Sequence, residues 1–306
     1  MFSPNVSERK SRAQRLKAKS KYLNVELVGI NIVLIDGKHI EISAEEYRSL
    51  LRKNRNLSLI KNILENLLNN KNFKSKGKMF NLVTGTWNPV TGCRYECSYC
   101  WARELATTKL KNSHRYIHGF KPMLNEGEFR SKFKKGDFIF VSDMGDLFGD
   151  LIPSDWIQKV LDHVRHFPEA SFLFLTKNPF RYNEFLFEMP ENAILGATIE
   201  TNNDQILQVH KVSGAPPPTR RYIAMRDLEW DKKFVAIEPI LDFDLETFNF
   251  WIDDVFPFLV YVGYDNYGNN LAEPMMSKTL SLIEKISENI LVIKKTIRPA
   301  WFESGM

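Results

Sequence analysis

All three cysteines of the 306-residue chain lie within eight residues, at Cys93, Cys97 and Cys100. Their spacing is C-x3-C-x2-C, and the aromatic residue Tyr99 stands just before the last cysteine. Three neighbouring thiols cannot all pair as disulfides, whereas thiolates this close together commonly bind a metal ion or an iron–sulfur cluster. Structural metal sites normally have four protein ligands. The spacing therefore predicts a metal or cluster site with one open coordination position.

A structural zinc ion is the alternative interpretation of the three cysteines. His114 and His118 are four residues apart on a possible helix, and either could supply a fourth ligand. The chain would then be a zinc-stapled α/β protein that binds nucleic acid. The sequence has no second cysteine pair and no histidine nearer to the three thiols, so we favour a cluster.

Composition and charge exclude several classes of protein. No run of about 18 apolar residues is present, so we expect no membrane span. The first residues, Met1-Phe2-Ser3-Pro4, lack the apolar segment of a secretory signal, and three reduced cysteines suit the cytoplasm.

Positive charge is concentrated at the start of the chain. Residues 1–21 carry seven basic side chains and one acidic side chain, which leaves 35 basic and 36 acidic residues in the rest. We expect a basic, disordered tail over 1–21. Such a tail favours contact with nucleic acid through release of counterions, although a solvated end that aids solubility is an equally good interpretation.

Residues 22–75 predict a small accessory unit, a β-hairpin followed by helices. Residues 25–42 hold two runs rich in β-branched and apolar residues, and Asp36-Gly37 between them is typical of a hairpin turn. Leucine and isoleucine at helical spacing predict a helix over 57–68. Nothing in this unit carries chemistry.

Residues 79–306 alternate apolar runs with amphipathic stretches, which predicts a parallel sheet covered by helices. An α/β fold with six or seven such units suits a partial or complete barrel, and a doubly wound open sheet is the competing topology. The predicted strands are 79–83, 138–141, 172–175, 193–199, 234–237, 259–262 and 290–293. The predicted helices are one starting near Trp101 and those at 154–166, 180–187, 204–212, 245–252 and 275–286.

The C-x3-C-x2-C motif, with an aromatic residue before the last cysteine and a position after the first barrel strand, resembles the radical S-adenosylmethionine (SAM) superfamily. The stretch 86–93 is similar, more narrowly, to a phage- and mobile-element-associated family of three-cysteine proteins of unknown function. Further similar stretches are 141–148, 175–179, 196–200 and 236–239. A more distant resemblance runs to spore photoproduct lyase, a radical SAM enzyme that repairs DNA.

This resemblance implies a radical SAM-type barrel and a 4Fe–4S cluster. Cys93, Cys97 and Cys100 would bind three irons, and the amino and carboxylate groups of SAM would chelate the fourth. An electron from a donor such as a ferredoxin or flavodoxin would cleave SAM to a 5′-deoxyadenosyl radical. The resemblance also implies a nucleic acid or a nucleotide-derived compound as substrate, whereas the zinc alternative implies no radical chemistry.

The resemblance further implies that residues at the carboxyl ends of the strands bind the cofactor. Many superfamily members hold the methionyl amine with Gly-Gly-Glu after the second strand, and this chain has 142–146 there instead. The alternative for each acidic residue is a helix cap or a salt bridge at a strand end, and Tyr99 could simply pack beside the cluster. The candidate cofactor-binding residues are Tyr99, Ser142, Asp143, Asp146, Lys177, Thr198, Glu200 and Glu238.

Overall fold

The computed structural model describes residues 31–34, 38–41, 80 and 83–303. Contacts divide the chain into two units, Met1–Asn70 and Lys71–Met306, which we treat separately. In the first unit β1 (Asn31–Leu34) pairs antiparallel with β2 (Lys38–Glu41), as the predicted hairpin requires. The predicted tail over 1–21 and the helix over 57–68 lie outside the described residues.

The second unit is built on a seven-stranded parallel sheet. Its order is β11-β10-β9-β8-β7-β6-β3, so every strand lies beside its predecessor in that series. A doubly wound sheet would place its first strand in the middle, so this order confirms the barrel topology. The strands are β3 (Gly85–Trp87), β6 (Phe138–Val141), β7 (Ser171–Thr176), β8 (Ala193–Thr198), β9 (Lys233–Ile237), β10 (Leu259–Val262) and β11 (Leu291–Lys294).

The predicted first strand was misplaced. We expected it over 79–83, but the first strand of the sheet is β3, and the described residues Phe80 and Val83 are buried without belonging to a strand. The reason lies in the position of Phe80. Its ring fills the interior of the sheet, so its apolar character reflects core packing and not strand pairing.

The same ring shows that the sheet is curled into a partial barrel. The ring centroid of Phe80 lies 5.2 Å from that of Phe140 on β6 and 4.8 Å from that of Tyr261 on β10. In a flat sheet these two strands, four positions apart, would be separated by about 19 Å. Because one ring touches both, the strands must curve around it.

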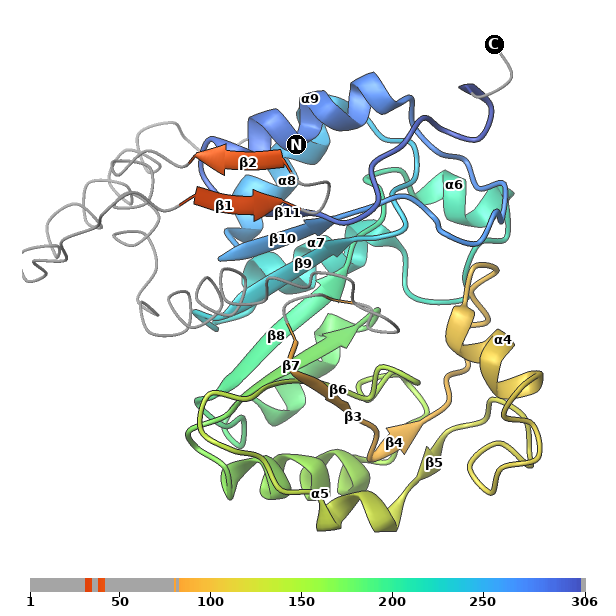
Figure 1. Ribbon diagram of the computed structural model, residues 1–306, viewed down its shortest axis with the longest axis vertical. Helices are drawn as coiled ribbons and strands as arrows, with labels where there is room; N and C mark the ends of the chain where they lie inside the picture. Colours follow the sequence, from red (N-terminus) through yellow and green to blue (C-terminus); the bar gives the residue numbers. More distant parts are fainter. Residues whose placement is uncertain (1–30, 35–37, 42–79, 81–82, 304–306) are drawn as a thin grey trace, which may run out of the picture. The chain divides into compact units, whose positions relative to one another are not determined.

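Helices cover the outer face of this partial barrel, and Figure 1 shows α5 and α9 at opposite ends of the row of strands. Buried faces of α5, α8 and α9 pack against outward-facing residues of the strands in one continuous apolar core. No helix within the described ranges is long and apolar enough to cross a membrane. The helices are α4 (Trp101–Thr107), α5 (Ser154–Arg165), α6 (Asp204–Val209), α7 (Pro218–Asp227), α8 (Leu245–Val255) and α9 (Met276–Ser287).

Short elements complete the connections. The predicted helix over 180–187 is a 3-10 helix, η2 (Pro179–Phe185). The helix α7 was not predicted, and it begins within a run of three prolines, residues 216–218. Pro217 caps α7 and Pro218 occupies its first turn, where a missing N–H costs nothing. Near the cysteines, β4 (Val90–Thr91) pairs with β5 (Met123–Leu124), and η1 (Glu126–Arg130) follows.

Candidate active site and metal centre

The cysteine loop, residues 93–100, connects the first strand of the sheet to α4. Figure 1 shows α4 on the side toward which β7 points, as expected for the functional end of a β/α barrel. Cys97 is buried, Cys93 and Cys100 are half-buried, and all three thiols are free. The start of α4 near Trp101 is confirmed.

Backbone N–H groups point at two of the sulfurs. The Tyr95 N–H donates to Cys93 Sγ at 3.5 Å, and the Arg103 N–H donates to Cys100 Sγ, the helix cap of α4, at 3.4 Å. Hydrogen bonds of this kind stabilise thiolate ligands in iron–sulfur proteins. Burial, reinforced by the Asp146 carboxylate and the other two sulfurs, raises the pKa of Cys93 well above its usual range. Burial likewise raises the pKa of Cys100.

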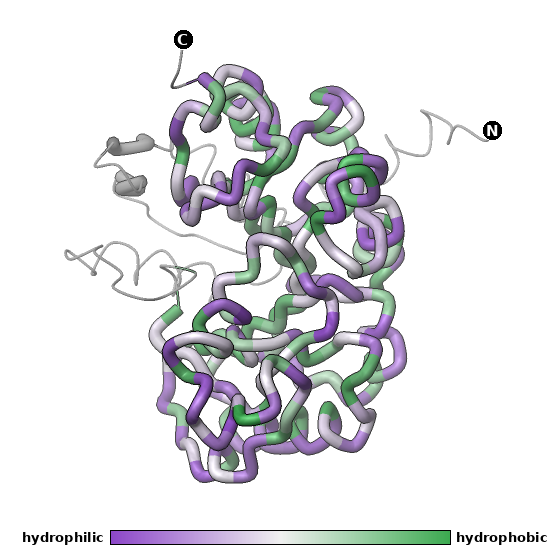
Figure 2. The backbone as a smooth tube through the Cα atoms, turned by 90° about the vertical axis from the view of Figure 1, so that its right-hand side faces the viewer, coloured by the Kyte–Doolittle hydropathy of each residue, from purple (hydrophilic) through white to green (hydrophobic). Residues whose placement is uncertain are grey.

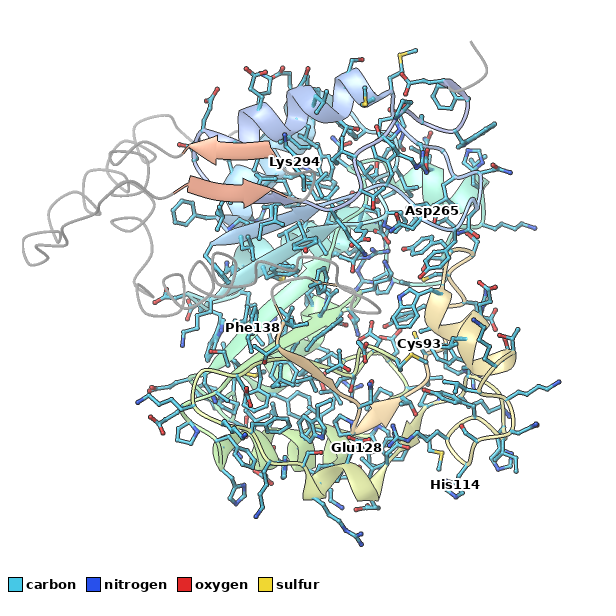
Figure 3. The ribbon with its side chains drawn as sticks, viewed as in Figure 1. Cys93, His114, Glu128, Phe138, Asp265 and Lys294 are labelled. Atoms are coloured by element: carbon cyan, nitrogen blue, oxygen red, sulfur yellow. The ribbon has the colours of Figure 1, made fainter. Side chains whose placement is uncertain are left out.

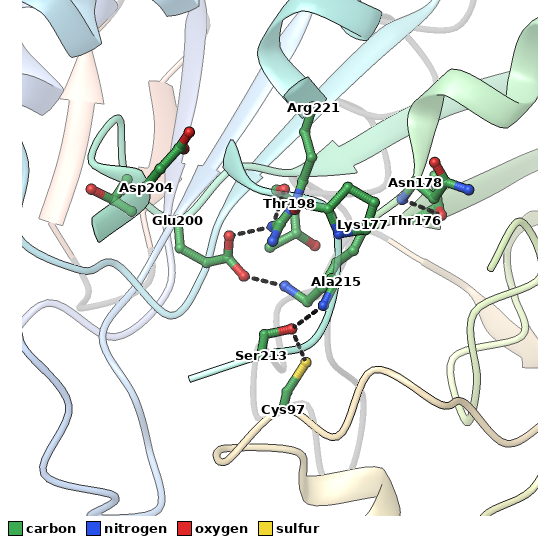
Figure 4. Close-up of polar contacts among 12 residues, drawn as sticks. Cys97, Thr176, Lys177, Asn178, Thr198, Glu200, Asp204, Ser213, Ala215 and Arg221 are labelled. Atoms are coloured by element: carbon green, nitrogen blue, oxygen red, sulfur yellow. Dashed lines mark hydrogen bonds and ion pairs between the residues drawn. The ribbon is translucent and has the colours of Figure 1, made fainter. Parts of the chain in front are cut away.

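A second loop, after α6, holds the cysteine loop in place. The Ser98 N–H donates to the Val212 carbonyl at 2.8 Å, and the Gly214 N–H donates to the Tyr95 carbonyl at 2.7 Å. Cys97 Sγ lies 3.1 Å from Ser213 Oγ, a contact visible in Figure 4. The loop after α6 therefore stabilises the position of the cysteine loop.

Gly92 allows the cysteine loop to approach the segment after α4. The Cys93 N–H donates to the Phe120 carbonyl at 3.0 Å, and Gly92 has a φ of 84°. A Cβ atom on Gly92 would lie 2.1 Å from the Lys121 carbonyl oxygen, which no real structure tolerates. Only glycine fits at this position, directly before the first cysteine.

We expect Gly92→Ala to lower the urea midpoint of unfolding strongly and to reduce the iron that the protein retains. Gly119→Ala is a matched control, because Gly119 also has a positive φ, 75°, but an added Cβ meets nothing within 4 Å. The control should lose only about 1–2 kcal/mol, the cost of a left-handed residue. Equal losses in the two variants would show that the backbone approach at Gly92 is unimportant.

Glu200, which follows β8, gathers three side chains around one buried carboxylate. Tyr99 Oη donates to Glu200 Oε1 at 2.5 Å, and Lys177 Nζ forms an ion pair with the same oxygen. Arg221 Nη1 donates to Glu200 Oε2 at 2.5 Å and to the Thr198 carbonyl at 3.0 Å. Figure 4 shows Lys177 and Arg221 reaching the carboxylate from different elements. The sequence placed Tyr99, Lys177, Thr198 and Glu200 at one site, and the structure brings all four together.

The charges in this cluster fix its protonation. Burial alone would raise the pKa of Glu200, but the Arg221 and Lys177 cations outweigh it and lower that pKa to about 2. Burial and the neighbouring carboxylate raise the pKa of Tyr99, so the phenol stays protonated and donates. Two cations then face the Glu200 carboxylate, and the buried Asp146 carboxylate also acts on Lys177.

The turn after β6 carries the candidates Ser142, Asp143 and Asp146. Asp143 accepts from Asn88 Nδ2 at 2.5 Å, and the Asp146 oxygens accept from Thr176 Oγ1 at 2.6 Å and from the Lys177 N–H at 2.9 Å. Asp146 therefore joins the ends of β6 and β7. Ser142 differs from both, because its buried Oγ has no hydrogen-bond partner among the residues that the structure describes.

Glu238, after β9, lies outside the Glu200 cluster. Its Oε1 pairs with Lys295, which follows β11, and its Oε2 is buried without a partner in the described part of the chain. Burial, which the Lys295 cation only partly offsets, raises the pKa of this carboxyl group. The structure thus separates Glu238 from the other candidates.

Three residues that position the site were not predicted: Ser213, Arg221 and Lys295. Lys295 comes directly after the last strand, so its location at a strand end was available as a signal. No such signal indicated Arg221, because it follows a run of prolines and its partner Glu200 is 21 positions away. Ser213 lies in a loop with no motif.

The three free thiols are the donor set of the cysteine loop. Within the described ranges, no three or more His, Cys, Asp or Glu side chains converge to hold one metal ion. A 4Fe–4S cluster does not need such convergence, since each thiolate binds its own iron. His114 and His118, the predicted zinc ligands, are exposed and lie in turns, not in a helix. Three free thiols with N–H donors at two of them are a suitable cluster loop.

A pocket of about 400 Å³ lies beside the last cysteine. Its walls come from the cysteine loop, from α4 and from the loop after β10. The side chains that line it include Tyr99, Cys100, Arg103, Glu104 and Asn269. Figure 2 shows hydrophobic and hydrophilic stretches interspersed along the loops of this side.

The comparisons with solved structures concern the fold. A spore photoproduct lyase variant with bound AdoMet and dinucleoside spore photoproduct is 11% identical, with a TM-score of 0.46 over 65% of this chain and 60% of that one. SuiB of Streptococcus suis, bound to precursor peptide SuiA, is 10% identical, with a TM-score of 0.45 over 85% and 67%. The chain thus spans about 60% of the length of the lyase.

Sequence comparison identifies the family directly. No curated protein matches the chain. A family model described as "Protein of unknown function (DUF5131)" matches residues 79–252, more than half of the chain and most of the barrel with its cysteine loop. The chain therefore belongs to the DUF5131 family.

Proposed function

We propose that this protein is a radical SAM enzyme that acts on a nucleic acid or a nucleotide-derived substrate. The observation that carries the proposal is the cysteine loop: every cysteine of the chain lies there, unpaired, at the functional end of a parallel partial barrel. When bound, a 4Fe–4S cluster with SAM would supply reductive cleavage of SAM and a 5′-deoxyadenosyl radical. Cys93, Cys97 and Cys100 would be the cluster ligands.

Two unpartnered polar atoms and one cation are suited to hold the methionyl end of SAM. Ser142 Oγ and Arg221 Nη2 are buried and have no partner among the described residues, so each has an unused hydrogen-bonding capacity. Lys177 and Arg221 also supply the cationic hydrogen-bond donors that bind carboxylates. We assign Ser142 to the amino group and Lys177 with Arg221 to the carboxylate.

Tyr99 acts as a positioning residue. It belongs to the cysteine loop, and its hydroxyl bond to Glu200 fixes that loop to the end of β8. Lys177 Nζ lies 5.3 Å from the centroid of the Tyr99 ring, which adds a cation–π contact. The thiols and the proposed SAM-binding residues are thus held in one rigid arrangement.

Two partners follow from the proposal. The segment after α4 is basic and exposed, with Lys109, Lys111 and Lys121, and it contacts the cysteine loop through Phe120. A negatively charged electron donor such as a ferredoxin or flavodoxin suits this surface. Nucleic acid would engage the basic tail, residues 1–21.

The proposal predicts that the full-length protein, reconstituted anaerobically with iron and sulfide, forms 5′-deoxyadenosine when SAM and dithionite are added. Product is measured by liquid chromatography and mass spectrometry across a panel of nucleosides, RNA and DNA. Cys100→Ala should form none, because it removes one cluster ligand. One zinc per chain, with neither iron nor labile sulfide, would instead support the zinc-stapled binding protein.

A further inference from the structure

Glu238 is a buried acid with one oxygen unused. The residue is 7% exposed, and its Oε1 is paired with Lys295 Nζ, while its Oε2 has no hydrogen-bond partner within the described ranges. A buried carboxylate oxygen left unpaired is costly, and such groups in proteins normally meet a partner. The proposed SAM-binding cluster around Glu200 makes no use of this oxygen. Glu238 therefore calls for a hydrogen-bond donor that the described residues do not supply.

The Glu238 carboxyl group is flanked by a glycine and by a second buried acid. Gly263, at the end of β10, presents no side chain: a Cβ built there would lie 3.7 Å from Glu238 Cδ. Burial is the main cause that raises the pKa of Glu238, and the charge of Asp265, which is also buried, adds to it. Glu238, Asp265 and Lys295 together carry one net negative charge, so the site favours a donor and disfavours an anion.

Tyr267 stands at the tip of a short loop beside these groups. Asp265 accepts from the Asn269 N–H at 2.8 Å and from Asn269 Nδ2 at 2.9 Å, which closes the loop around Tyr267. The base of the loop is fixed by Arg298, which donates to the Asp265 carbonyl at 2.7 Å. Tyr267 nevertheless remains 60% exposed. The hydrogen-bonded loop thus holds the aromatic ring of Tyr267 exposed to solvent.

The Tyr267 ring lies within electrostatic range of Glu238 and of α4, the helix that follows the cysteine loop. The charges of Glu238, Asp265 and Glu104 of α4 all act on the Tyr267 hydroxyl, so the ring is within electrostatic range of both sides. Asn269 lines the pocket that Cys100 also lines. Figure 3 shows Asp265 and Cys93 on the same side of the sheet. A ligand between Tyr267 and Glu238 would be next to the proposed radical source.

We propose that Glu238 and Tyr267 form the substrate subsite and bind a planar nitrogen heterocycle, a nucleobase. A ring or exocyclic N–H donates to Glu238 Oε2, and the face of the base stacks on Tyr267. Lys295 holds the carboxylate in position through Oε1. This inference rests on the proposed function for the chemistry that follows binding, but the binding itself needs neither cluster nor SAM cleavage.

Equilibrium dialysis of the full-length, reconstituted protein with saturating SAM tests the subsite, with the common nucleosides as probes. At least one nucleoside should bind. Glu238→Gln should weaken its binding about tenfold or more, the value of a hydrogen bond to a charged group, and Tyr267→Ala at least about fivefold. The N-methylated form of that nucleoside, which lacks the donor, should bind more weakly to the parent protein but lose nothing further in Glu238→Gln.

Two controls are available. Glu246→Gln changes an exposed acid that pairs with Lys285, and Phe187→Ala removes a fully exposed ring elsewhere, so neither should alter binding. Absence of binding by every nucleoside at millimolar concentration, or equal binding by Glu238→Gln and Glu246→Gln, would overturn the proposal. Loss of SAM affinity in Glu238→Gln with nucleoside binding intact would overturn it too. Failure to form 5′-deoxyadenosine while nucleosides bind would count against the proposed function alone.

Discussion

Replacing Cys97 with alanine should abolish the broad visible absorption that the reconstituted protein is expected to show, together with its labile sulfide. Cys97 is the central thiol of the loop and is buried between its neighbours, and the sequence contains no fourth cysteine that could take its place. Iron and sulfide analysis of anaerobically reconstituted samples, with an absorption spectrum, gives the result. We expect at least a severalfold loss of iron per chain.

The control for Cys97→Ala is the exposed neighbour Ser98. Ser98→Ala changes the same loop by a similar volume and keeps the backbone N–H that donates to Val212. It should retain the iron and the spectrum. If Cys97→Ala absorbs as strongly as Ser98→Ala, the three cysteines are not cluster ligands and the proposed function is wrong.

The second large effect is expected at Glu200. Glu200 and Arg221 are both completely buried, so Glu200→Gln would leave Arg221 and Lys177 without the anion that compensates them. Breaking a buried ion pair by removing one partner costs about 3–5 kcal/mol. For a chain of this size we expect Tm to fall by on the order of 10 °C, measured by circular dichroism.

The pH dependence of the protein's stability gives an independent test of the Glu200 cluster. The pKa of Glu200 is about 2 in the folded protein and lower than its ordinary value of 4.5. The carboxylate therefore stabilises the fold above about pH 4.5, and this contribution is lost as the pH falls from 4.5 toward 2. The difference in Tm between the parent protein and Glu200→Gln should shrink over that range.

Glu169→Gln is the control for the Glu200 experiments. Glu169 also pairs with a lysine, Lys135, but the two side chains are 62% and 81% exposed, so solvent screens the pair and its loss should change Tm little. A similar Tm for Glu200→Gln and Glu169→Gln would show that the Glu200 cluster is not a structural centre.

The sheet was largely predictable because parallel strands are buried on both faces and appear as uninterrupted apolar runs. The strands over 138–141 and 259–262 match β6 and β10 residue for residue. The helix α7 was not predicted because it lacks a clear apolar pattern. It buries the charged residue Arg221 and exposes the apolar residue Ile223.

The candidate site was predictable only to the level of strand ends. Residues after parallel strands gather at one edge whatever their identity, which explains why Lys177, Thr198 and Glu200 were found together. Their individual contacts depend on long side chains that cross between elements. No local pattern indicates that Arg221 completes Glu200, or that Glu238 turns instead toward Lys295.

The bond from Tyr99 to Glu200 joins residues 101 positions apart. On the ribosome, the cysteine loop emerges well before β8 and α7 exist, so it cannot take its final shape until those elements have been made. Contacts this distant in sequence are slow to form. Stable metal loading should consequently wait for the synthesis of α7, and a chain truncated before residue 221 should be unable to retain iron.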